Sequence, residues 1–338
     1  MKTLIASIFV FGLLIFFHEF GHFLAARANG IQVLELAIGF GPKIFGWKKK
    51  GTAYSLRLFP LGGYCRLLGE NPEEAGKPGS FTQKSPARRA VVLAAGSAMN
   101  LLLALLLFFI IFYFFVGVQQ PDRSIIGLVI PETPAEKAGL QSGDEITAIN
   151  GEPVENWNEI VRAIEGHPGE EISLVVKRNG VIKEFHLTAE ADLDGNGKIG
   201  IGPLMQKYQF WGALGTSFER FGMIVASIFQ VLTGQAPLDV TGPVGIIKIV
   251  SEVAETGFVN LLWLTGLISI SLGLINILPI PALDGGRLFF LLIEALRGQP
   301  LDPEKEGLIH FIGFLLLILL ILLVTYNDLI RWDILPGR

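Results

Sequence analysis

The chain has 338 residues, of which 51% are hydrophobic and only 17% are charged, and its mean hydropathy is +0.52. This composition excludes an ordinary soluble protein and predicts a polytopic α-helical membrane protein. The net charge of −4 gives no indication of nucleic-acid binding. Cys65 is the single cysteine, which excludes an internal disulfide and a zinc site built from cysteines.

Residues 1–28 form the first apolar segment and predict the first transmembrane helix. Lys2 ahead of an apolar run also fits a cleaved signal peptide, but the run is too long and is interrupted by ionisable residues. Those residues are His18, Glu19 and His22, and ionisable side chains within a span are costly and usually functional. On a helix, the two histidines project from one face, one turn apart.

The His-Glu-x-x-His spacing of this segment is the pattern of zinc proteases. Two imidazoles one helical turn apart can bind the same metal ion, and Glu19 beside them can take a proton from the attacking water. The alternative is a pair of satisfied core histidines with a buried carboxylate. The membrane setting and a third ligand candidate further along the chain favour zinc ligation by His18 and His22, with Glu19 as the catalytic base.

Residues 29–89 are the most basic part of the chain, so the positive-inside rule predicts that they lie in the cytoplasm and the N-terminus outside. β-forming residues from 52 to 68, interrupted by Gly62 and Gly63, predict one or two β-hairpins dipping toward the membrane, with Pro60 turning the chain. Two roles stay open. The segment is a plain cytoplasmic hairpin, or it is an edge strand on which Gly62 and Gly63 hold an extended substrate peptide.

Residues 90–118 form a second long apolar segment and predict the second span. Residues 119–205 are polar and mixed in charge, with the strand, turn and helix patterns of a compact α+β domain. Because this domain follows the second span, we expect it to lie outside the cytoplasm. Residues 206–257 are mostly amphipathic, which favours a helix at the membrane surface over a span.

The 119–205 domain resembles a PDZ domain of the bacterial protease type. The resemblance is carried by Pro-Ala-x-x-Ala-Gly-Leu-x-x-Gly-Asp-x-Ile, from Pro134 to Ile146. PDZ domains bind peptide ends by adding the peptide as a strand to the edge of a sheet. The resemblance therefore implies a groove for peptide termini, with a binding strand formed by Gly127, Leu128, Val129 and Ile130.

Residues 258–286 form a third span that ends in Asn-Ile-Leu-Pro-Ile-Pro-Ala-Leu-Asp-Gly-Gly, starting at Asn276. Prolines and glycines at membrane depth break a helix, which is tolerated where the backbone lines a protein cavity. Such a break presents Asp284 to the interior, as a helix N-cap or as a metal ligand. A catalytic zinc takes three protein ligands, which His18, His22 and Asp284 would supply. Asn276 is a candidate for binding the substrate backbone or the developing oxyanion.

Residues 307–326 predict the fourth span, and the basic residues ahead of it indicate that the C-terminus lies outside, like the N-terminus. This span contains His310, which has no partner at metal-ligand spacing and is interpreted as a packing or interfacial residue. Two other functions compete with a protease. A non-enzymatic, membrane-anchored PDZ module would have no use for Glu19 between two imidazoles, and a metal transporter would need polar groups in spans that are almost wholly apolar.

The His-Glu-x-x-His motif paired with Asn-x-x-Pro-x-Pro-x-Leu-Asp-Gly resembles the site-2 protease family. With the PDZ domain between them, the motifs resemble bacterial regulator-of-sigma-factor proteases of the RseP/RasP type, although the enterobacterial form has two PDZ domains. The resemblance implies an intramembrane zinc metalloendopeptidase of the bacterial inner membrane with one Zn²⁺ per chain. It implies single-span membrane proteins as substrates, namely anti-sigma factors and remnant signal peptides. The other partners would be the lipid bilayer and peptide termini at the PDZ domain, and no nucleic acid.

Overall fold

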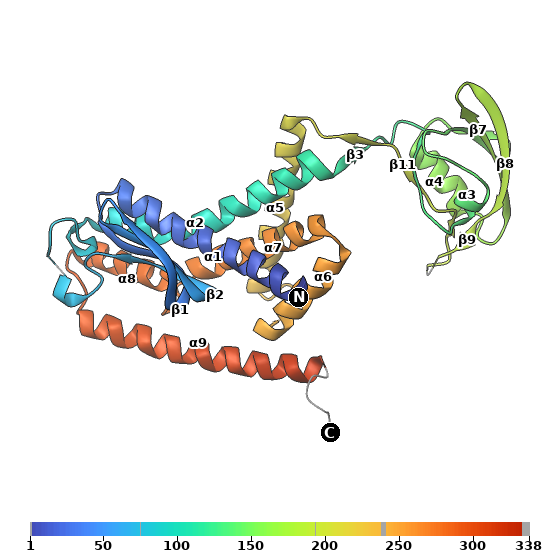
Figure 1. Cartoon of the computed structure of the whole chain (residues 1–338). Helices are drawn as coiled ribbons and strands as arrows, with labels where there is room; N and C mark the ends of the chain where they lie inside the picture. Colours follow the sequence, from blue (N-terminus) through green and yellow to red (C-terminus); the bar gives the residue numbers. More distant parts are fainter. Residues whose placement is uncertain (1, 75, 193, 238–240, 333–338) are drawn as a thin grey trace. The chain divides into compact units, whose positions relative to one another are not determined.

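The computed structural model describes residues 2–74, 76–192, 194–237 and 241–332 (Figure 1). The chain divides into two compact units. The membrane unit comprises Met1–Ile111 and Leu214–Arg338, and the inserted unit comprises Phe112–Ala213.

Four helices of the described chain are long and apolar enough to cross a membrane. Each has at least the roughly 20 residues that the hydrocarbon core of a bilayer requires. The polytopic helical fold expected from the sequence is therefore confirmed. The four helices are α1 (Lys2–Ala28), α2 (Pro86–Ile110, continued to Phe115 by a π-helical turn), α7 (Phe258–Ile277) and α9 (Pro303–Arg331).

Helices α1, α2 and α7 pack against one another and form the centre of the membrane unit. Small residues let them approach closely, as is usual between helices in lipid. A Cβ atom on Gly21 of α1 would lie 2.3 Å from the Ala95 carbonyl oxygen of α2, and one on Gly273 of α7 would lie 2.9 Å from Leu101. Ser269 of α7 also donates a hydrogen bond to the Asn100 carbonyl oxygen at 2.7 Å.

Helix α9 is packed much less than the other three. Only 6% of its most apolar window is buried, against 28–39% for the others, so most of its surface is left for lipid (Figure 1). Near its C-terminal end the buried carboxylate of Asp328 accepts hydrogen bonds from the backbone N–H groups of Gly242, at 3.1 Å, and Gly245, at 2.8 Å. These glycines lie at the start of α6 (Pro243–Thr256), so one acidic side chain on α9 caps the N-terminus of α6.

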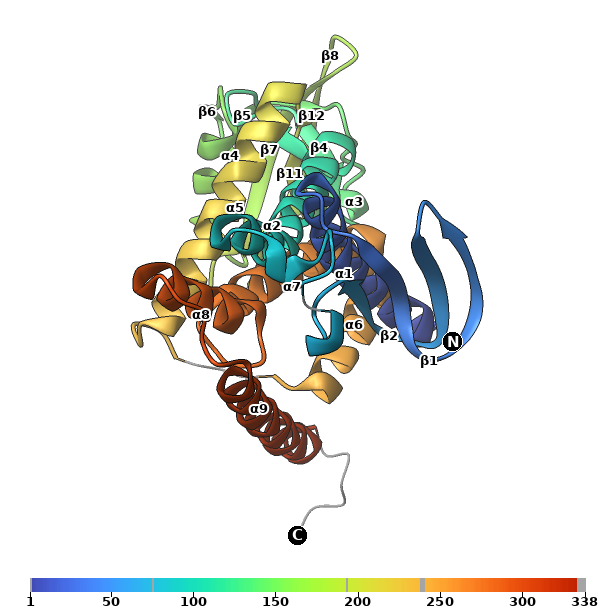
Figure 2. The same ribbon diagram turned by 90° about the vertical axis from the view of Figure 1, so that its left-hand side faces the viewer.

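A long β-hairpin lies beside α1 (Figure 2). It pairs β1 (Val33–Lys49) with β2 (Thr52–Leu67), and its turn lies between them, where Lys50 and Gly51 both have positive φ. Although β2 is assigned as one strand, the chain reverses direction between Leu56 and Gly63, because 53–56 and 63–66 run in opposite directions along 35–38; the predicted turn at Pro60 agrees with this reversal. The sequence argument did not predict that β2 pairs with β1. Several register shifts between the two strands accommodate the change of direction within the hairpin.

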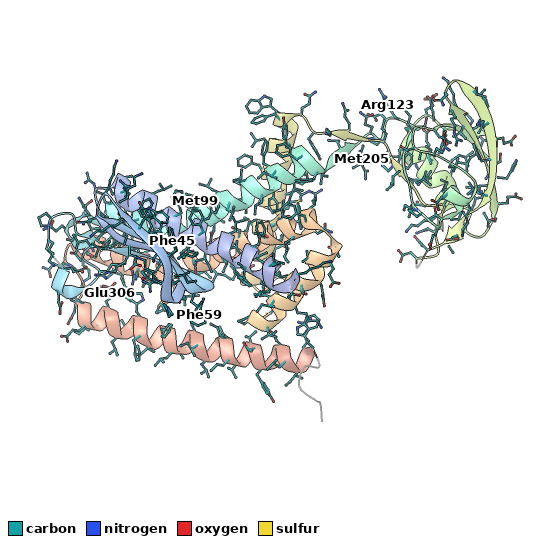
Figure 3. All side chains as sticks on the ribbon, viewed as in Figure 1. Phe45, Phe59, Met99, Arg123, Met205 and Glu306 are labelled. Carbon is teal, nitrogen blue, oxygen red and sulfur yellow. The ribbon has the colours of Figure 1, made fainter. Side chains whose placement is uncertain are left out.

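The hairpin folds back on itself. Leu36 is in register with Tyr54 on one side and with Cys65 on the other, and Gly63 lies opposite Ile38. Gly63 therefore lies in the returning part of β2, just after the chain reverses, and Gly62 before it has φ of +130°. Large apolar side chains point outward from this hairpin, which suits a membrane-associated element; Figure 3 labels two of them, Phe45 and Phe59, which are 61% and 58% exposed.

Helices α5 (Phe210–Leu232) and α6 occupy the segment 206–257. Neither is among the four candidate spans, and a position at the membrane surface stays a prediction. The remaining elements of the membrane unit are short: η1 (Pro72–Glu74), η2 (Phe81–Gln83) and the amphipathic α8 (Asp284–Arg297), which follows the break after α7.

The inserted unit is an α+β domain built around one apolar core. Its main sheet has the order β6-β5-β7-β8, and β4 pairs separately with β11. The expected inserted PDZ-type domain is confirmed in this arrangement of short strands and two helices. The elements are β3 (Gly117–Gln119), β4 (Ile126–Val129), α3 (Pro134–Lys137), β5 (Glu145–Ile149), β6 (Glu152–Pro153), α4 (Trp157–Glu165), β7 (Glu171–Arg178), β8 (Val181–Thr188), β9 (Glu190–Ala191), β10 (Gly197–Lys198), β11 (Ile201–Pro203) and β12 (Met205–Lys207).

An ion pair explains the aspartate of the Gly-Asp-x-Ile signature. The Asp144 carboxylate is 1% exposed and accepts two hydrogen bonds of 2.6 Å from the Arg178 guanidinium and one from the Gln141 backbone N–H. Burial opposes ionisation of Asp144, but these hydrogen bonds outweigh it and hold the pKa of the carboxyl below its usual value. The pair fastens the end of β7 to the turn that precedes β5.

Candidate metal centre

The three predicted metal ligands meet in the membrane unit. His18 and His22 lie one turn apart on α1, and Asp284 is the first residue of α8. Their Nε2 atoms are 3.2 Å apart, and Oδ2 of Asp284 lies 3.3 Å from Nε2 of His18 and 3.2 Å from Nε2 of His22. Two segments far apart in sequence thus bring three candidate donor atoms into a nearly equilateral triangle.

This triangle fits a tetrahedral zinc ion. Zinc–ligand distances of about 2.0–2.1 Å give separations of about 3.3–3.4 Å between ligand atoms in a tetrahedron. Oδ2 of Asp284 is also buried without a hydrogen-bond partner in the described part of the chain, although both imidazole nitrogens are near it. Two imidazole nitrogens and a carboxylate oxygen that converge in this way are matched by a shared cation, and two imidazoles with one carboxylate are a donor set that suits zinc.

Contacts from α2 orient the two imidazoles. Nδ1 of His22 donates a hydrogen bond of 2.8 Å to the Val92 carbonyl oxygen, which leaves the Nε2 lone pair facing Asp284. Gly96 lies against both rings, since a Cβ there would be 2.3 Å from Nε2 of His22 and 2.7 Å from Cε1 of His18. The sequence argument missed this contact, which depends on how α2 lies against α1.

The break after α7 brings Asp284 to the histidines. Helix α7 ends at Ile277, and no helix is assigned again until Asp284. Gly285 and Gly286 lie directly on the backbone of the break, where added Cβ atoms would be 2.1 Å from the Leu278 carbonyl oxygen and 2.4 Å from that of Ile280. The two glycines therefore allow the start of α8 to fold tightly against the broken segment.

Glu19 lies between two cavities. One of about 470 Å³ is lined by His18, Glu19, His22 and Asp284 and by polar residues that include Arg66, Glu70 and Arg287. A second of about 240 Å³ is lined by His18 and Glu19 together with the predicted substrate-binding residues Gly62, Gly63 and Asn276, and also with Asn100. The structure therefore gathers all the predicted residues of this unit around one carboxylate.

The edge of the hairpin passes closest to that carboxylate. A Cβ on Gly63 would be 3.3 Å from Cγ of Glu19, and the backbone of Cys65 lies beside the Glu19 carboxyl group. Burial raises the pKa of the Cys65 thiol, so it stays protonated and acts as a small packed residue.

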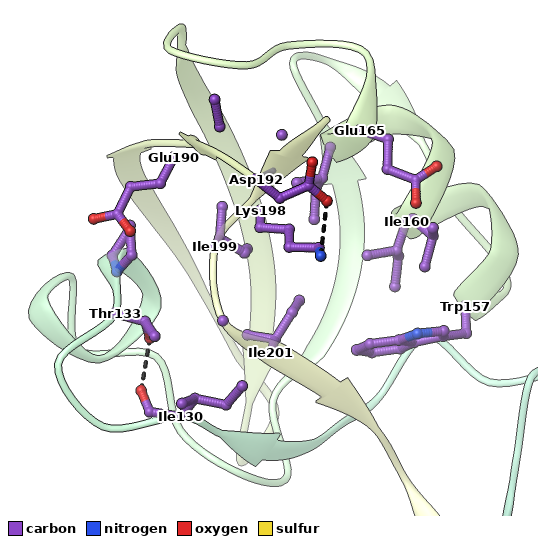
Figure 4. A pocket seen from close by; sticks show the side chains of 16 residues that line it. Ile130, Thr133, Trp157, Ile160, Glu165, Glu190, Asp192, Lys198, Ile199 and Ile201 are labelled. Atoms are coloured by element: carbon purple, nitrogen blue, oxygen red, sulfur yellow. Dashed lines mark hydrogen bonds and ion pairs between the residues drawn. The ribbon is translucent and has the colours of Figure 1, made fainter. Parts of the chain in front are cut away.

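The inserted unit has a groove of its own, with a cavity of about 590 Å³ (Figure 4). One wall of the groove is formed by Trp157 and Ile160 of α4, and the other by the segment 197–201. In that segment Lys198 forms an ion pair with Asp192 at 2.7 Å. Of the four residues expected to form the binding strand, Ile130 lines this cavity and Gly127, Leu128 and Val129 do not. The sequence argument missed 197–201; the signal was the short run Ile199-Gly200-Ile201, which leads into β11.

Comparison with known proteins identifies the class. Residues 6–320 match the family model described as Peptidase family M50. The chain belongs to this family. It is therefore a multi-pass membrane metalloprotease of the site-2 protease class, as the paired motifs indicated, and the expectation of a proteolytic enzyme is confirmed.

Curated relatives span nearly the whole chain. It is 37% identical over 417 residues to the zinc metalloprotease RasP of Geobacillus kaustophilus, covering 97% of this chain and 98% of the relative. It is 35% identical over 420 residues to the regulator of sigma-W protease RasP of Bacillus subtilis, covering 98% and 99%. Among solved structures, the PDZ domain of the SdrC-like protein of Listeria innocua matches 26% of this chain and 100% of that domain, with 26% identity and a TM-score of 0.23.

Proposed function

We propose that this protein is an intramembrane zinc metalloendopeptidase that hydrolyses peptide bonds in the transmembrane segments of single-span membrane proteins. The supporting observation is the triangle of His18, His22 and Asp284 donor atoms beside Glu19, among helices that are apolar enough to span a bilayer. Anti-sigma factors are the first proposed substrate class, in line with the regulator of sigma-W protease among the relatives. Remnant signal peptides are the second.

His18, His22 and Asp284 would hold one Zn²⁺ per chain. A zinc ion bound there supplies Lewis acidity, which polarises a carbonyl group and makes water a nucleophile near neutral pH. His22 is oriented for this role by its hydrogen bond to Val92, and Gly96 leaves room for both rings.

Glu19 is the proposed general base. Its carboxylate takes the proton of the attacking water and then delivers it to the nitrogen of the leaving amine, so the carboxylate is regenerated when the peptide bond is broken. Its position between the two cavities supports this role, because substrate and water can approach it from different sides.

Gly62, Gly63 and Asn276 are the proposed substrate-binding residues. A helical substrate hides its carbonyl groups, so the scissile segment must be extended before it is cleaved. The β2 edge at Gly63–Leu67 has β1 on one side and Glu19 near the other, which suits strand addition by an extended peptide. The Asn276 amide would donate to the substrate backbone or to the developing oxyanion.

The inserted unit is proposed to bind a peptide terminus in the groove between α4 and residues 197–201. Ile130 keeps its predicted contact with the ligand, while Gly127, Leu128 and Val129 support it from β4, which pairs with β11. In this proposal the protein lies in the bacterial inner membrane. Both termini and the inserted unit face away from the cytoplasm, because the basic segment 29–89 faces it.

The decisive experiment replaces the proposed base. Purified full-length Glu19→Gln should cleave a single-span membrane reporter about 10²–10⁴-fold more slowly than the unaltered protein and should still bind zinc, because the three ligands are intact. Glu252→Gln, the same change at an exposed residue of α6, should leave the rate unaltered. Cleavage by Glu19→Gln at the normal rate would refute the assignment, and cleavage that survives full zinc removal would refute the metalloprotease mechanism.

A further inference from the structure

The segment that carries Asp284 contains a residue in a strained conformation. Ala282 has φ of +76°, a left-handed region that residues with a side chain rarely adopt. It lies two residues before Asp284, between Pro281 and the start of α8. A residue persists in such a conformation only when surrounding contacts hold it there.

One of those contacts comes from α9. The break from 279 to 283 contains two prolines, so only three of its residues have backbone N–H groups. Those of Ile280 and Leu283 close local turns, onto the carbonyl oxygens of Leu278 and Ile280. The third, on Ala282, donates a hydrogen bond of 2.9 Å to Nδ1 of His310.

Other contacts hold His310 beside the break. Its ring packs edge-on against Phe290 of α8, with the centroids 5.3 Å apart. One turn further along α9, Gly313 lies directly on the break, since a Cβ there would be 2.4 Å from Cβ of Pro281. Helix α9 is otherwise poorly packed, and it comes close to the rest of this unit at the break that presents Asp284 and, near its other end, at the start of α6.

We propose that His310 is a positioning residue for the metal centre: it accepts the Ala282 N–H bond, fixes the strained backbone before α8 and so holds the Asp284 carboxylate toward His18 and His22. The inference rests on the proposed role of Asp284 as a zinc ligand. It replaces the interpretation of His310 as a packing residue with a defined hydrogen-bonding role. Residues that orient a ligand typically change metal affinity when they are altered, even though they do not touch the metal.

The test uses two substitutions of nearly identical shape. In His310→Asn the amide oxygen takes the place of Nδ1 and can accept the Ala282 bond, whereas in His310→Leu a methyl group stands there. Both lose the ring contact with Phe290, so the difference between them isolates the hydrogen bond. In the full-length protein, zinc affinity by chelator competition should fall about 10-fold in His310→Leu and stay within about 3-fold of normal in His310→Asn.

A second measurement does not depend on zinc. Hydrogen exchange of the Ala282 amide in the zinc-free protein should be faster in His310→Leu than in His310→Asn. If the Leu variant does not fold, Gly313→Ala tests the same contact by pushing Pro281 away from α9, and it should also weaken zinc binding. Equal zinc affinities in the Asn and Leu variants, or normal affinity in Gly313→Ala, would overturn the proposal.

Two further variants separate this inference from the rest of the mechanism. Asp328→Asn weakens a polar contact at the far end of α9 and should leave zinc affinity unchanged. An equal loss there would show that general docking of α9 matters, which overturns a specific role for His310. Asp284→Asn should lose zinc, and if it keeps zinc the proposed ligand set is wrong. If Asp284→Asn loses zinc but the two His310 variants bind zinc with equal affinity, the ligand set stands and only the role of His310 is refuted.

Discussion

The two units place their candidate sites in opposite surroundings. In the membrane unit, imidazoles and carboxylates gather among apolar helices, whereas in the inserted unit an apolar groove, with Trp157 and Ile160 on one wall, is set in a polar domain. Each site consists of groups that its surroundings disfavour, which is costly unless the groups have a partner. The residues that indicate function are therefore those whose polarity differs from that of their surroundings.

The sites also differ in how they are assembled. The candidate metal centre joins α1 to α8, with close contacts from α2 at the imidazoles and from α9 at the break before Asp284. The inserted unit has its own core and its own buried ion pair. We therefore expect each site to be altered without changing the other, and the following variants test that separation from the largest expected effect to the smallest.

Asn276→Ala should impair chemistry without impairing metal binding. Loss of an oxyanion donor typically lowers kcat by about 10²–10³-fold, and we expect a fall of that size with unchanged zinc affinity. Steady-state cleavage of a membrane reporter, together with zinc titration, measures both. Asn260→Ala is the matched control: Asn260 lies on the same helix, and among the described residues its side-chain amide bonds Thr256. This variant should have normal kcat and normal zinc affinity. A normal kcat in Asn276→Ala would remove this residue from the mechanism.

Arg178→Ala should disturb only the inserted unit. It leaves Asp144 buried and unpaired, which should reduce the stability of this unit by about 3 kcal/mol. Hydrogen exchange of the β5 and β7 amides in the full-length protein measures the change. Lys177→Ala next to it removes an exposed ion pair with Glu145 and should change stability by less than about 1 kcal/mol. Altered zinc affinity in Arg178→Ala would contradict the independence of the two sites.

The pH dependence of stability is a second test of the Asp144–Arg178 pair. Because the pKa of Asp144 is lowered in the folded chain, its ionised form contributes stability above the usual aspartate pKa of about 3.9, and that contribution is lost as the pH falls through the lowered value. Arg178→Ala removes the two hydrogen bonds from the guanidinium that lower the pKa and keeps only the one from the Gln141 backbone N–H, so Asp144 should take up its proton at a higher pH. Exchange measured from pH 6 to pH 3 would contradict this if both proteins lost stability over the same interval.

Gly96→Ala should disturb only the metal centre. The added methyl group would collide with His22 and His18, so the rings must move, and we expect zinc affinity to fall about 10–100-fold. Gly12→Ala in α1, where an added Cβ meets nothing within 4 Å, is the control and should bind zinc normally. Normal affinity in Gly96→Ala would mean that the imidazoles can relax, and that α2 does not orient them.

Local signals made much of this organisation predictable. Helix periodicity put His18 and His22 on one face, and prolines and glycines at membrane depth singled out Asp284. Length and hydropathy gave the four spans, and the turn and signature residues of 119–205 gave the inserted domain. The functional roles of these site residues stay predictions until they are tested.

The features that were missed depend on contacts between distant segments. The partner of β2 is β1, whose register shifts conceal it from an argument based on alternation within residues 52–68. Gly96 touches the imidazoles because α2 lies against α1 there, and His310 bonds the break before Asp284 because α9 meets it. One wall of the groove in the inserted unit is formed by residues 197–201, which lie far along the chain from the signature at Pro134 to Ile146 that indicated the domain.

The most direct test of the account is the zinc content of the purified full-length protein, measured by elemental analysis beside that of Asp284→Ala. The account predicts about one zinc ion per chain in the unaltered protein and a content near zero in the variant after the same dialysis, because two imidazoles alone are an incomplete catalytic zinc site. Equal zinc content in the two proteins would contradict the claim that Asp284 joins His18 and His22 around one ion.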